Sequence, residues 1–203
     1  ADIPTCKATV GLVPEGPRAA RLQELKEIAD FAKLLGVGAV GLHLGFMPHD
    51  PADPQYAAIL GVVREVCAYL GRSGQRLHLE TGQETADTLV RFLEDAKCDN
   101  LCVNFDPANM ILYGSGDPIE AVKKVAPYVR SVHCKDGKWA AQPGKEWGRE
   151  VPFGQGDVGA ENFLRTLKEL GYTGALTIER EIPDEPARQK DEIGQAVRLL
   201  NEL

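Results

Sequence analysis

The chain has 203 residues, of which 43% are hydrophobic and 26% are charged, a composition typical of a globular domain and unlike that of a disordered chain. Its formal net charge is −7 at pH 7 and no block of Lys and Arg residues occurs, which argues against nucleic acid as a partner. No apolar run approaches the roughly 20 residues that span a bilayer, and the first residues do not resemble a signal peptide. We therefore expect a cytoplasmic protein without membrane association.

The cysteines are odd in number and show no CxxC spacing, so we expect reduced thiols and no disulfide framework. They are Cys6, Cys67, Cys98, Cys102 and Cys134.

Extended and helical patterns alternate from the start of the chain. The short apolar segment 9–13 predicts a strand, and apolar residues at helical spacing over 22–35 predict a helix that stops at Gly36. A second strand is expected over 39–46, and a second helix over 55–70.

Four further strands are predicted, and each ends on a side chain that can bind a metal or transfer a proton. They span 76–80, 101–106, 129–133 and 175–179, and they end on Glu80, Asp106, His133 and Glu179. Helices are expected over 85–95, 118–125 and 161–170 and from Pro186 onward, and a long loop from His133 to about Gly159.

This alternation leaves an open doubly wound sheet or a closed (β/α) barrel. Groups at the carboxyl ends of several successive strands converge above a barrel, so the four strand ends favour the barrel. A barrel of this type uses eight strands in ~250 residues, whereas only six are recognised in this sequence. We therefore expect one barrel domain over residues 1–203 that lacks the first two βα units.

Open edges would remain at 9–13 and 175–179 in such a sheet. Exposed edges and apolar faces promote association, so we expect a homo-oligomer, or strands that lie outside the present sequence.

The four strand-end residues form an oxygen-rich set with a single imidazole. Such a set suits one divalent ion, with Mn²⁺, Mg²⁺ or Co²⁺ preferred and Zn²⁺ also compatible. Any one of them alone is more often a satisfied polar residue at a strand end. Four at equivalent positions predict a metal site.

Five ordered motifs resemble the sugar phosphate isomerase/epimerase group of xylose isomerase-like TIM barrels. They lie at Leu79–Glu84, Asn104–Met110, Val132–Gly137, Pro152–Asp157 and Gly174–Arg180. The resemblance implies a sugar substrate and one divalent metal bound by Glu80, Asp106, His133 and Glu179. It also implies that Glu80 and Glu179 transfer protons.

The chemistry of the set agrees with that implication. A metal that holds the carbonyl and a neighbouring hydroxyl of a sugar stabilises the enediolate that forms when the adjacent C–H is lost. Proton removal by one Glu, and return by the other or by the same one, gives epimerisation or aldose–ketose isomerisation.

Four other residues are candidate substrate contacts. His43 ends the second strand, where it could contact a substrate hydroxyl or make a structural hydrogen bond within the protein; the sequence favours neither. Lys135 follows His133 directly, and Trp139 lies in the long loop, where it could cover the sugar ring or pack within the loop. Asn109 stands where ketose 3-epimerases of this group carry His, which argues against a close 3-epimerase match.

Three further features have open interpretations. Asp136 could orient a metal ligand or cap the loop. Glu181 would share the face of Glu179 one step further out, and so rivals it as a ligand. Gly154-Gln-Gly156 is too weak a motif to indicate a phosphate-binding loop.

Other functions on the same scaffold remain open. A metal-dependent sugar or cyclitol dehydratase begins with the same proton abstraction. Apurinic-site endonucleases share the barrel and use three zinc ions; His43 resembles one of their ligands, but Asn109 replaces another, and the acidic charge disfavours DNA. A third hypothesis is a non-catalytic fragment, because two of the eight strands of a closed barrel are not recognised in the sequence.

Overall fold

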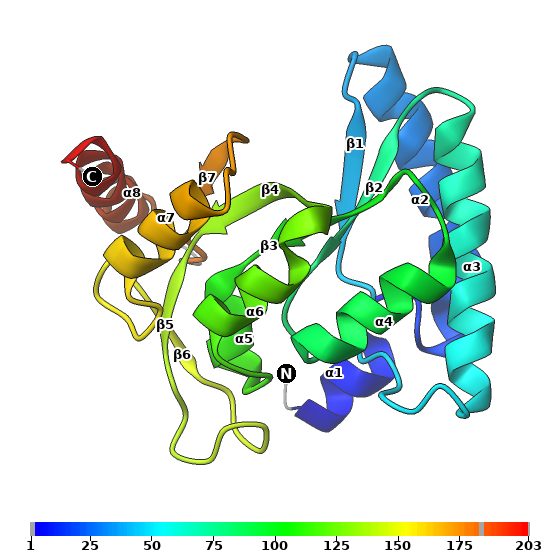
Figure 1. The fold of residues 1–203 in the computed structure, drawn as a ribbon, viewed down its shortest axis with the longest axis horizontal. Helices are drawn as coiled ribbons and strands as arrows, with labels where there is room; N and C mark the ends of the chain where they lie inside the picture. Colours follow the sequence, from blue (N-terminus) through cyan, green and yellow to red (C-terminus); the bar gives the residue numbers. More distant parts are fainter. Residues whose placement is uncertain (1–2, 183–184, 203) are drawn as a thin grey trace. The chain divides into compact units, whose positions relative to one another are not determined.

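The structure is a computed structural model that describes residues 3–182 and 185–202. Helices and strands alternate along it (Figure 1). The helices are α1 (Ile3–Thr9), α2 (Glu15–Leu34), α3 (Pro54–Gly71), α4 (Ala86–Ala96), α5 (Pro107–Tyr113), α6 (Pro118–Val125), the 3₁₀ turn η1 (Ala126–Tyr128), α7 (Ala160–Glu169) and α8 (Pro186–Glu202). The strands are β1 (Ala39–Leu42), β2 (Arg76–Glu80), β3 (Leu101–Phe105), β4 (Val129–Cys134), β5 (Asp136–Lys138), β6 (Arg149–Val151) and β7 (Leu176–Ile178).

Five strands form one sheet in the order β1-β2-β3-β4-β7, and β5 and β6 form a separate antiparallel pair. The pairs β1–β2, β2–β3 and β4–β7 are parallel, as strands joined by crossover helices must be. This βα alternation confirms the predicted α/β class and an incomplete (β/α) barrel. The sheet has one strand fewer than the six expected, and the described residues do not form a closed eight-stranded barrel.

The prediction of a strand over 9–13 is wrong. Helix α1 ends at Thr9, and the next residues form bends outside the sheet. The amides of Leu12 and Val13 both donate to the carbonyl of Leu44, so this segment bonds to the chain that follows β1. Gly11 has a φ of +72°, and a Cβ there would lie 2.1 Å from the Leu44 oxygen. An apolar segment of five residues forms a strand or such a packed loop, and its hydrophobic pattern does not distinguish the two.

The residues group into two compact units. In the first (Ala1–Glu80 with Asp87–Asn104), α2 and α3 lie side by side and cover β1 and β2 (Figure 1). Helix α3 has Asp53 as its N-cap and Pro54 at its first position, a common helix start. Its buried residues Ile59, Val63 and Leu70 supply much of the core of this unit.

The second unit (Thr81–Ala86 with Phe105–Leu203) contains β4 to β7 and α5 to α8. Phe105 and Phe163 are fully buried and stack with ring centroids 5.9 Å apart. Helix α8 lies against β7, where Ala196 packs in a cluster with Cys134, Phe153 and Ala160.

Helix α1, the turn η1, helix α5 and the strands β5 and β6 were not expected from the sequence. Helix α5 follows β3 directly, and the predicted long loop after His133 contains the β5–β6 hairpin. All five cysteines are thiols outside any disulfide. Among the helices of the described residues, none has the length and hydropathy needed to cross a membrane.

Candidate metal site

Each of the four predicted ligands lies at the carboxyl end of a parallel strand. Glu80 is the last residue of β2, and Asp106 directly follows β3. His133 is the penultimate residue of β4 and pairs with Thr177 of β7, and the Glu179 amide donates to the Cys134 carbonyl at 3.3 Å. The β4–β7 register therefore places Glu179 two residues beyond Thr177, the partner of His133, on the same face of the strand.

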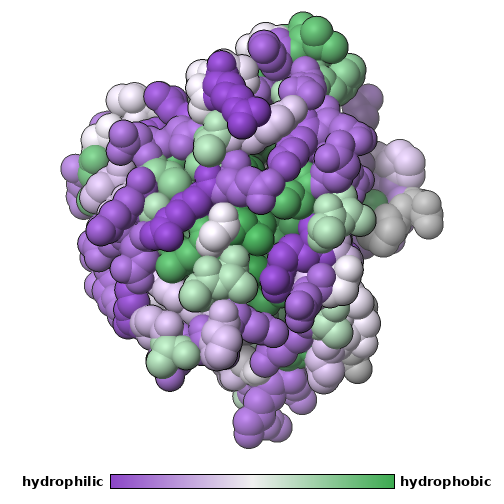
Figure 2. All heavy atoms as spheres, turned by 90° about the vertical axis from the view of Figure 1, so that its right-hand side faces the viewer, coloured by the Kyte–Doolittle hydropathy of each residue, from purple (hydrophilic) through white to green (hydrophobic). Residues whose placement is uncertain are grey.

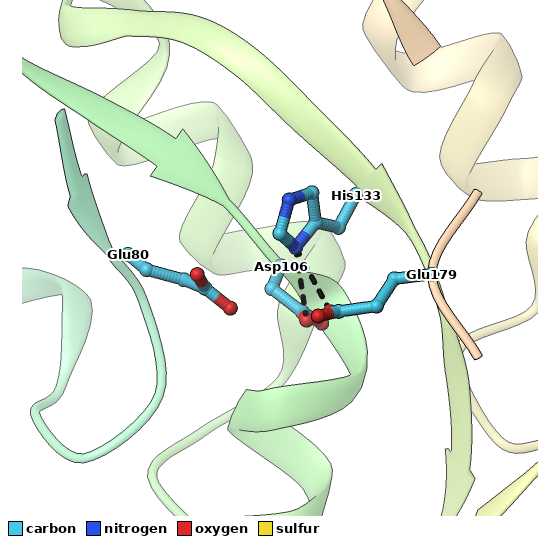
Figure 3. A group of neighbouring side chains, drawn as sticks. All are labelled: Glu80, Asp106, His133 and Glu179. Atoms are coloured by element: carbon cyan, nitrogen blue, oxygen red, sulfur yellow. Dashed lines mark ion pairs between the residues drawn. The ribbon is translucent and has the colours of Figure 1, made fainter. Parts of the chain in front are cut away.

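The ligand atoms of Glu80, Asp106, His133 and Glu179 lie within 4.8 Å of one another (Figure 3). His133 Nδ1 is 3.0 Å from Glu179 Oε2 and 3.6 Å from Asp106 Oδ2. The structure thus brings together the four residues that the sequence singled out.

Asp106 uses its two carboxylate oxygens for different purposes. It is the N-cap of α5, where Oδ1 accepts the Asn109 amide at 3.0 Å, while Oδ2 faces His133. Pro107 then occupies the first helical position, where its missing N–H costs nothing. Thr81 exchanges two hydrogen bonds with the Asp106 backbone, of 2.8 and 3.0 Å. The side chain of Asp106 is fully buried and held in one orientation.

The charge state of Glu179 follows from its neighbours. The hydrogen bond with His133 lowers the pKa of Glu179 to about 2; burial opposes this shift, and the positive charge of Lys135 adds to it. Glu179 is therefore an ionised carboxylate at neutral pH.

Lys135 is a buried cation beside the ligands, with 4% of its side chain exposed. Its Nζ lies 3.1 Å from Glu179 Oε2, 3.6 Å from Glu181 Oε1 and 3.8 Å from Asp106 Oδ2. Burial acts to lower the pKa of Lys135, but the charges of Asp106, Glu179 and Glu181 outweigh it and hold the pKa above its usual value. Lys135 therefore remains an ammonium group.

Glu181, the rival ligand, does not join the four. Its side chain is 69% exposed and contacts Lys135, whereas Glu179 is 28% exposed and contacts His133. In the first unit, His43 Nε2 lies 3.4 Å from Glu80 Oε1. The sequence allowed a substrate hydroxyl or a group of the protein as the partner of His43, and in the structure a carboxylate of the protein contacts it.

Asn109 lies beside Asp106, to which its amide donates, and Trp139 lies at the start of the hairpin loop. Asn109 is 3% exposed in the first turn of α5, and Gly82 lies so close that a Cβ there would be 3.1 Å from the Asn109 Cβ. Trp139 follows β5, is 37% exposed, and donates its amide to Asp157 Oδ2 at 3.0 Å. The structure thus places Trp139 by its backbone at the start of the hairpin loop.

Asp136 caps the glycine-rich loop after β6. Its Oδ1 accepts the amides of Gly137 and Val158, and its Oδ2 accepts those of Gly154 and Gly156. Burial raises the pKa of Asp136, and these four bonds oppose that shift. Of the two roles that the sequence allowed, the loop cap is the one that the contacts describe.

Sequence reasoning missed two residues with many contacts here. Thr81 follows Glu80 in the chain and fastens its loop to Asp106. Arg180 follows Glu179, and 7% of its side chain is exposed, between Glu150 and Glu192. The position of Arg180, a charged residue at the end of an apolar strand and next to a candidate ligand, was the signal that could have identified it.

The donor set is chemically suited to a divalent cation. Three carboxylates and one imidazole carry more negative charge than the ammonium group of Lys135 balances, and burial makes such a surplus costly without a further cation. Oxygen donors with one nitrogen fit Mg²⁺, Mn²⁺ or Co²⁺.

Comparison with known proteins agrees with the fold. Residues 8–203 match the xylose isomerase-like TIM barrel family. The chain is 52% identical to a xylose isomerase domain protein from Planctomyces limnophilus, with a TM-score of 0.93 over 100% of this chain and 71% of that chain. A xylose isomerase-like TIM barrel protein from Mycobacterium smegmatis, solved in complex with magnesium, is 24% identical with a TM-score of 0.69 over 88% of this chain and 65% of that one.

Two more distant structures share the fold alone. A probable 3-DHS dehydratase, AsbF from Bacillus anthracis, is 15% identical with a TM-score of 0.74 over 92% of this chain and 72% of that one. An L-ribulose 3-epimerase is 19% identical with a TM-score of 0.68 over 89% and 62%.

The uncharacterized protein YihM of Escherichia coli (strain K12) is 30% identical over 118 residues, 56% of this chain and 36% of that protein. The matched part is 39% of a second curated relative, MJ1311 of Methanocaldococcus jannaschii. The chain therefore spans well under half of the length of these curated relatives. Its own match to the family extends over residues 8–203, and the chain belongs to the xylose isomerase-like TIM barrel family.

Proposed function

We propose that the chain carries the catalytic site of a divalent-metal-dependent isomerase or epimerase of sugars or sugar phosphates. The observation that carries this proposal is the convergence of Glu80, Asp106, His133 and Glu179 from four strands. The epimerase among the structural neighbours supports the reaction class.

When bound by these four residues, a divalent ion would polarise the carbonyl of the sugar and stabilise the enediolate. Glu80 and Glu179 would move the proton. The strand order places β2 and β7 on either side of β3 and β4, so the two Glu come from the outer strands of the four. A base on each side of the reacting carbon is what inversion at that carbon requires.

The remaining candidates would bind and orient the substrate. Lys135, held as an ammonium beside Glu179, would donate to a substrate oxygen. His43, through its contact with Glu80, and Asn109, next to Asp106, would contact hydroxyl groups. Trp139 would cover the sugar ring from the hairpin loop.

The substrate would be a small-molecule sugar, and the protein would act in the cytoplasm as a homo-oligomer. Membrane and nucleic acid are not expected partners.

A metal-dependent dehydratase is the second candidate, supported by the dehydratase among the structural neighbours. It would use the same Glu to remove the proton and then expel a hydroxyl group. An apurinic-site endonuclease is less favoured, because the net charge of −7 repels DNA.

The test begins with protein freed of metal by chelation and titrated calorimetrically with Mn²⁺, Mg²⁺, Co²⁺ and Zn²⁺. We expect one ion per chain. The loaded protein is then incubated in D₂O with a panel of ketoses, aldoses and their phosphates, and proton NMR follows exchange of the C–H next to the carbonyl. Glu181→Gln serves as the matched control, because Glu181 is a nearby exposed carboxylate outside the ligand set.

An isomerase or epimerase incorporates deuterium and forms an isomeric sugar. A dehydratase instead forms a product that has lost water, and an endonuclease would cleave an abasic oligonucleotide and leave the sugars unchanged. Absence of metal binding, or of exchange with every sugar, would refute the proposal.

A further inference from the structure

Glu179 directly follows β7, which pairs with a single strand, β4, among the residues that the structure describes. Strand β7 is last in the order of the described sheet, and its ladder with β4 ends at the Glu179 amide. The direction of the Glu179 carboxylate therefore depends on what holds the chain just beyond that bond.

Arg180 holds that point. Its Nε donates to Glu192 of α8 at 2.6 Å, and a second guanidinium nitrogen donates to Glu150 of β6 at 2.7 Å. Glu150 also accepts the Glu181 amide at 3.0 Å, and Gln189 of α8 donates to the Arg180 carbonyl at 3.0 Å. Side chain and backbone of this one residue are thus fastened to two other elements.

The charges of the group balance internally. Arg188 lies on the exposed side of Glu192 and donates to it at 2.7 Å, so two arginines meet two carboxylates. Glu150 and Glu192 are only 13% and 10% exposed, and Arg180 is 7% exposed, whereas Arg188 is 52% exposed. The guanidinium fork is needed at position 180, because its two nitrogens reach carboxylates on two different elements, which a single ammonium group does less well.

We propose that Arg180 is a positioning residue for the metal site: by fastening the end of β7 to β6 and α8, it sets the direction of Glu179. The inference rests on the proposed function in so far as Glu179 is a metal ligand. Helix α8, which carries no ligand, would then contribute to metal affinity. By thermodynamic linkage, metal binding would in turn stabilise the packing of α8 against β7.

The test compares three variants of the full chain. Arg180→Met removes the fork but keeps an unbranched side chain. Arg188→Met is the matched control, because it removes the other arginine bonded to Glu192 without touching β7. The combined variant R180M/E150Q/E192Q also neutralises the two carboxylates that lose the Arg180 guanidinium in Arg180→Met. It therefore tests the position of Glu179 in a protein without that charge imbalance. Each is titrated with Mn²⁺, melted in EDTA, and followed by hydrogen exchange at the amides of residues 179 and 181.

We expect Arg180→Met to weaken Mn²⁺ binding about 10- to 100-fold, the range for residues that orient metal ligands, and Arg188→Met to change it by less than about threefold. The combined variant should melt near the wild-type temperature in EDTA yet bind Mn²⁺ as weakly as Arg180→Met. Recovery of Mn²⁺ affinity in the combined variant would show that Arg180 only neutralises its neighbours, and would overturn the proposal. Equal losses in the two single variants would do so as well.

Hydrogen exchange separates this proposal from the proposed function. If wild-type protein binds no metal, the proposed function fails, but the metal-free protein still tests Arg180. We then expect the amides of residues 179 and 181 to exchange at least about tenfold faster in Arg180→Met and at the wild-type rate in Arg188→Met. Unchanged exchange in Arg180→Met would overturn the positioning role.

Discussion

Glu80 and Glu179 have two proposed duties, ligand and proton carrier, and substitution by Gln separates them. Gln keeps an oxygen ligand but cannot accept a proton. We therefore expect Glu80→Gln and Glu179→Gln each to lower turnover by about 10²- to 10⁴-fold, the usual contribution of general acid–base catalysis, with a smaller effect on metal affinity. Initial rates with the sugar identified by deuterium exchange, set against calorimetric metal affinity, measure both. Near-normal rates would remove either residue from the proton-transfer role.

Substitution of Lys135 distinguishes a role in metal binding from a role in substrate binding. Its Nζ contacts Glu179 at 3.1 Å, so loss of the positive charge makes the ligand carboxylates more attractive to a cation. We expect Lys135→Met to keep or strengthen metal binding while KM rises about 10- to 100-fold, as for the loss of a charged hydrogen bond of about 1.5–3 kcal/mol. Weaker metal binding with an unchanged KM would assign Lys135 to the metal site and not to the substrate.

Among the elements, the loop after β6 depends on one carboxylate. Each oxygen of Asp136 accepts two backbone amides, and an Asn side chain can replace only one of these oxygens. Two buried N–H groups would then face an amide NH₂, at about 1–3 kcal/mol each. We expect Asp136→Asn to lower the free energy of unfolding by about 2–6 kcal/mol in urea denaturation. The control Asp157→Asn, at a more exposed carboxylate, should cost less than about 1 kcal/mol; similar losses in both variants would contradict this account.

Element by element, the sequence predicted best where a periodic pattern had clear boundaries. The helix expected over 118–125 has those bounds, and the strand expected over 76–80 spans Arg76–Glu80. Strand alternation put Glu179 and Glu181 on one face, since alternate residues of a strand share a face, and so could not choose between them.

The misses have physical causes. Helix α5 starts at Pro107 within a motif that was interpreted only as a ligand site, although Asp followed by Pro is also a helix start. The β5–β6 hairpin has strands of three residues, too short for an alternating pattern. Leu12 and Val13 bond to Leu44, a contact between segments distant in sequence that no local pattern encodes. For the site, residue types and strand ends were predictable, but the partners of Arg180 come from β6 and α8 and were not.

For the molecule as a whole, bound metal should raise resistance to unfolding. A ligand that binds only the folded state adds about 2.7 kcal/mol at 100 times its Kd. For a chain of this size we expect a rise in Tm of about 5–11 °C on adding Mn²⁺ to chelated protein, measured by calorimetry. Asp106→Asn is the control, because Asn also caps helices but brings no ligand charge. An equal rise in that variant would place the stabilising ion elsewhere.

Exposed apolar side chains on α2 predict association of these 203 residues. Ile28, Phe31 and Leu34 recur at helical spacing and are 48%, 61% and 83% exposed, and Leu35 follows at 64%. Apolar side chains gather at the top of the face in Figure 2, the level at which Figure 1 places the carboxyl end of α2. Within the described residues, the sheet order begins with β1 and not with the expected strand 9–13.

We expect light scattering to give a mass above one chain at micromolar concentration, and the double variant F31E/L34E to lower it. The control Lys33→Glu changes charge on the same helix without removing apolar surface. A monomer at all concentrations would contradict the expectation of a homo-oligomer.

The two oxygens of the Asp106 carboxylate have different partners, and this affects the rate at which a metal ion can bind. Oδ1 accepts a hydrogen bond from the first turn of α5, and Thr81 is hydrogen-bonded to the backbone of Asp106. The rotamer and main chain of Asp106 are therefore fixed when the protein folds. An arriving ion would find Oδ2 already oriented and would have little conformational entropy left to remove there. Uptake should then be governed by how quickly the ion sheds its water shell, so that Mn²⁺ would enter sooner than the more tightly hydrated Mg²⁺.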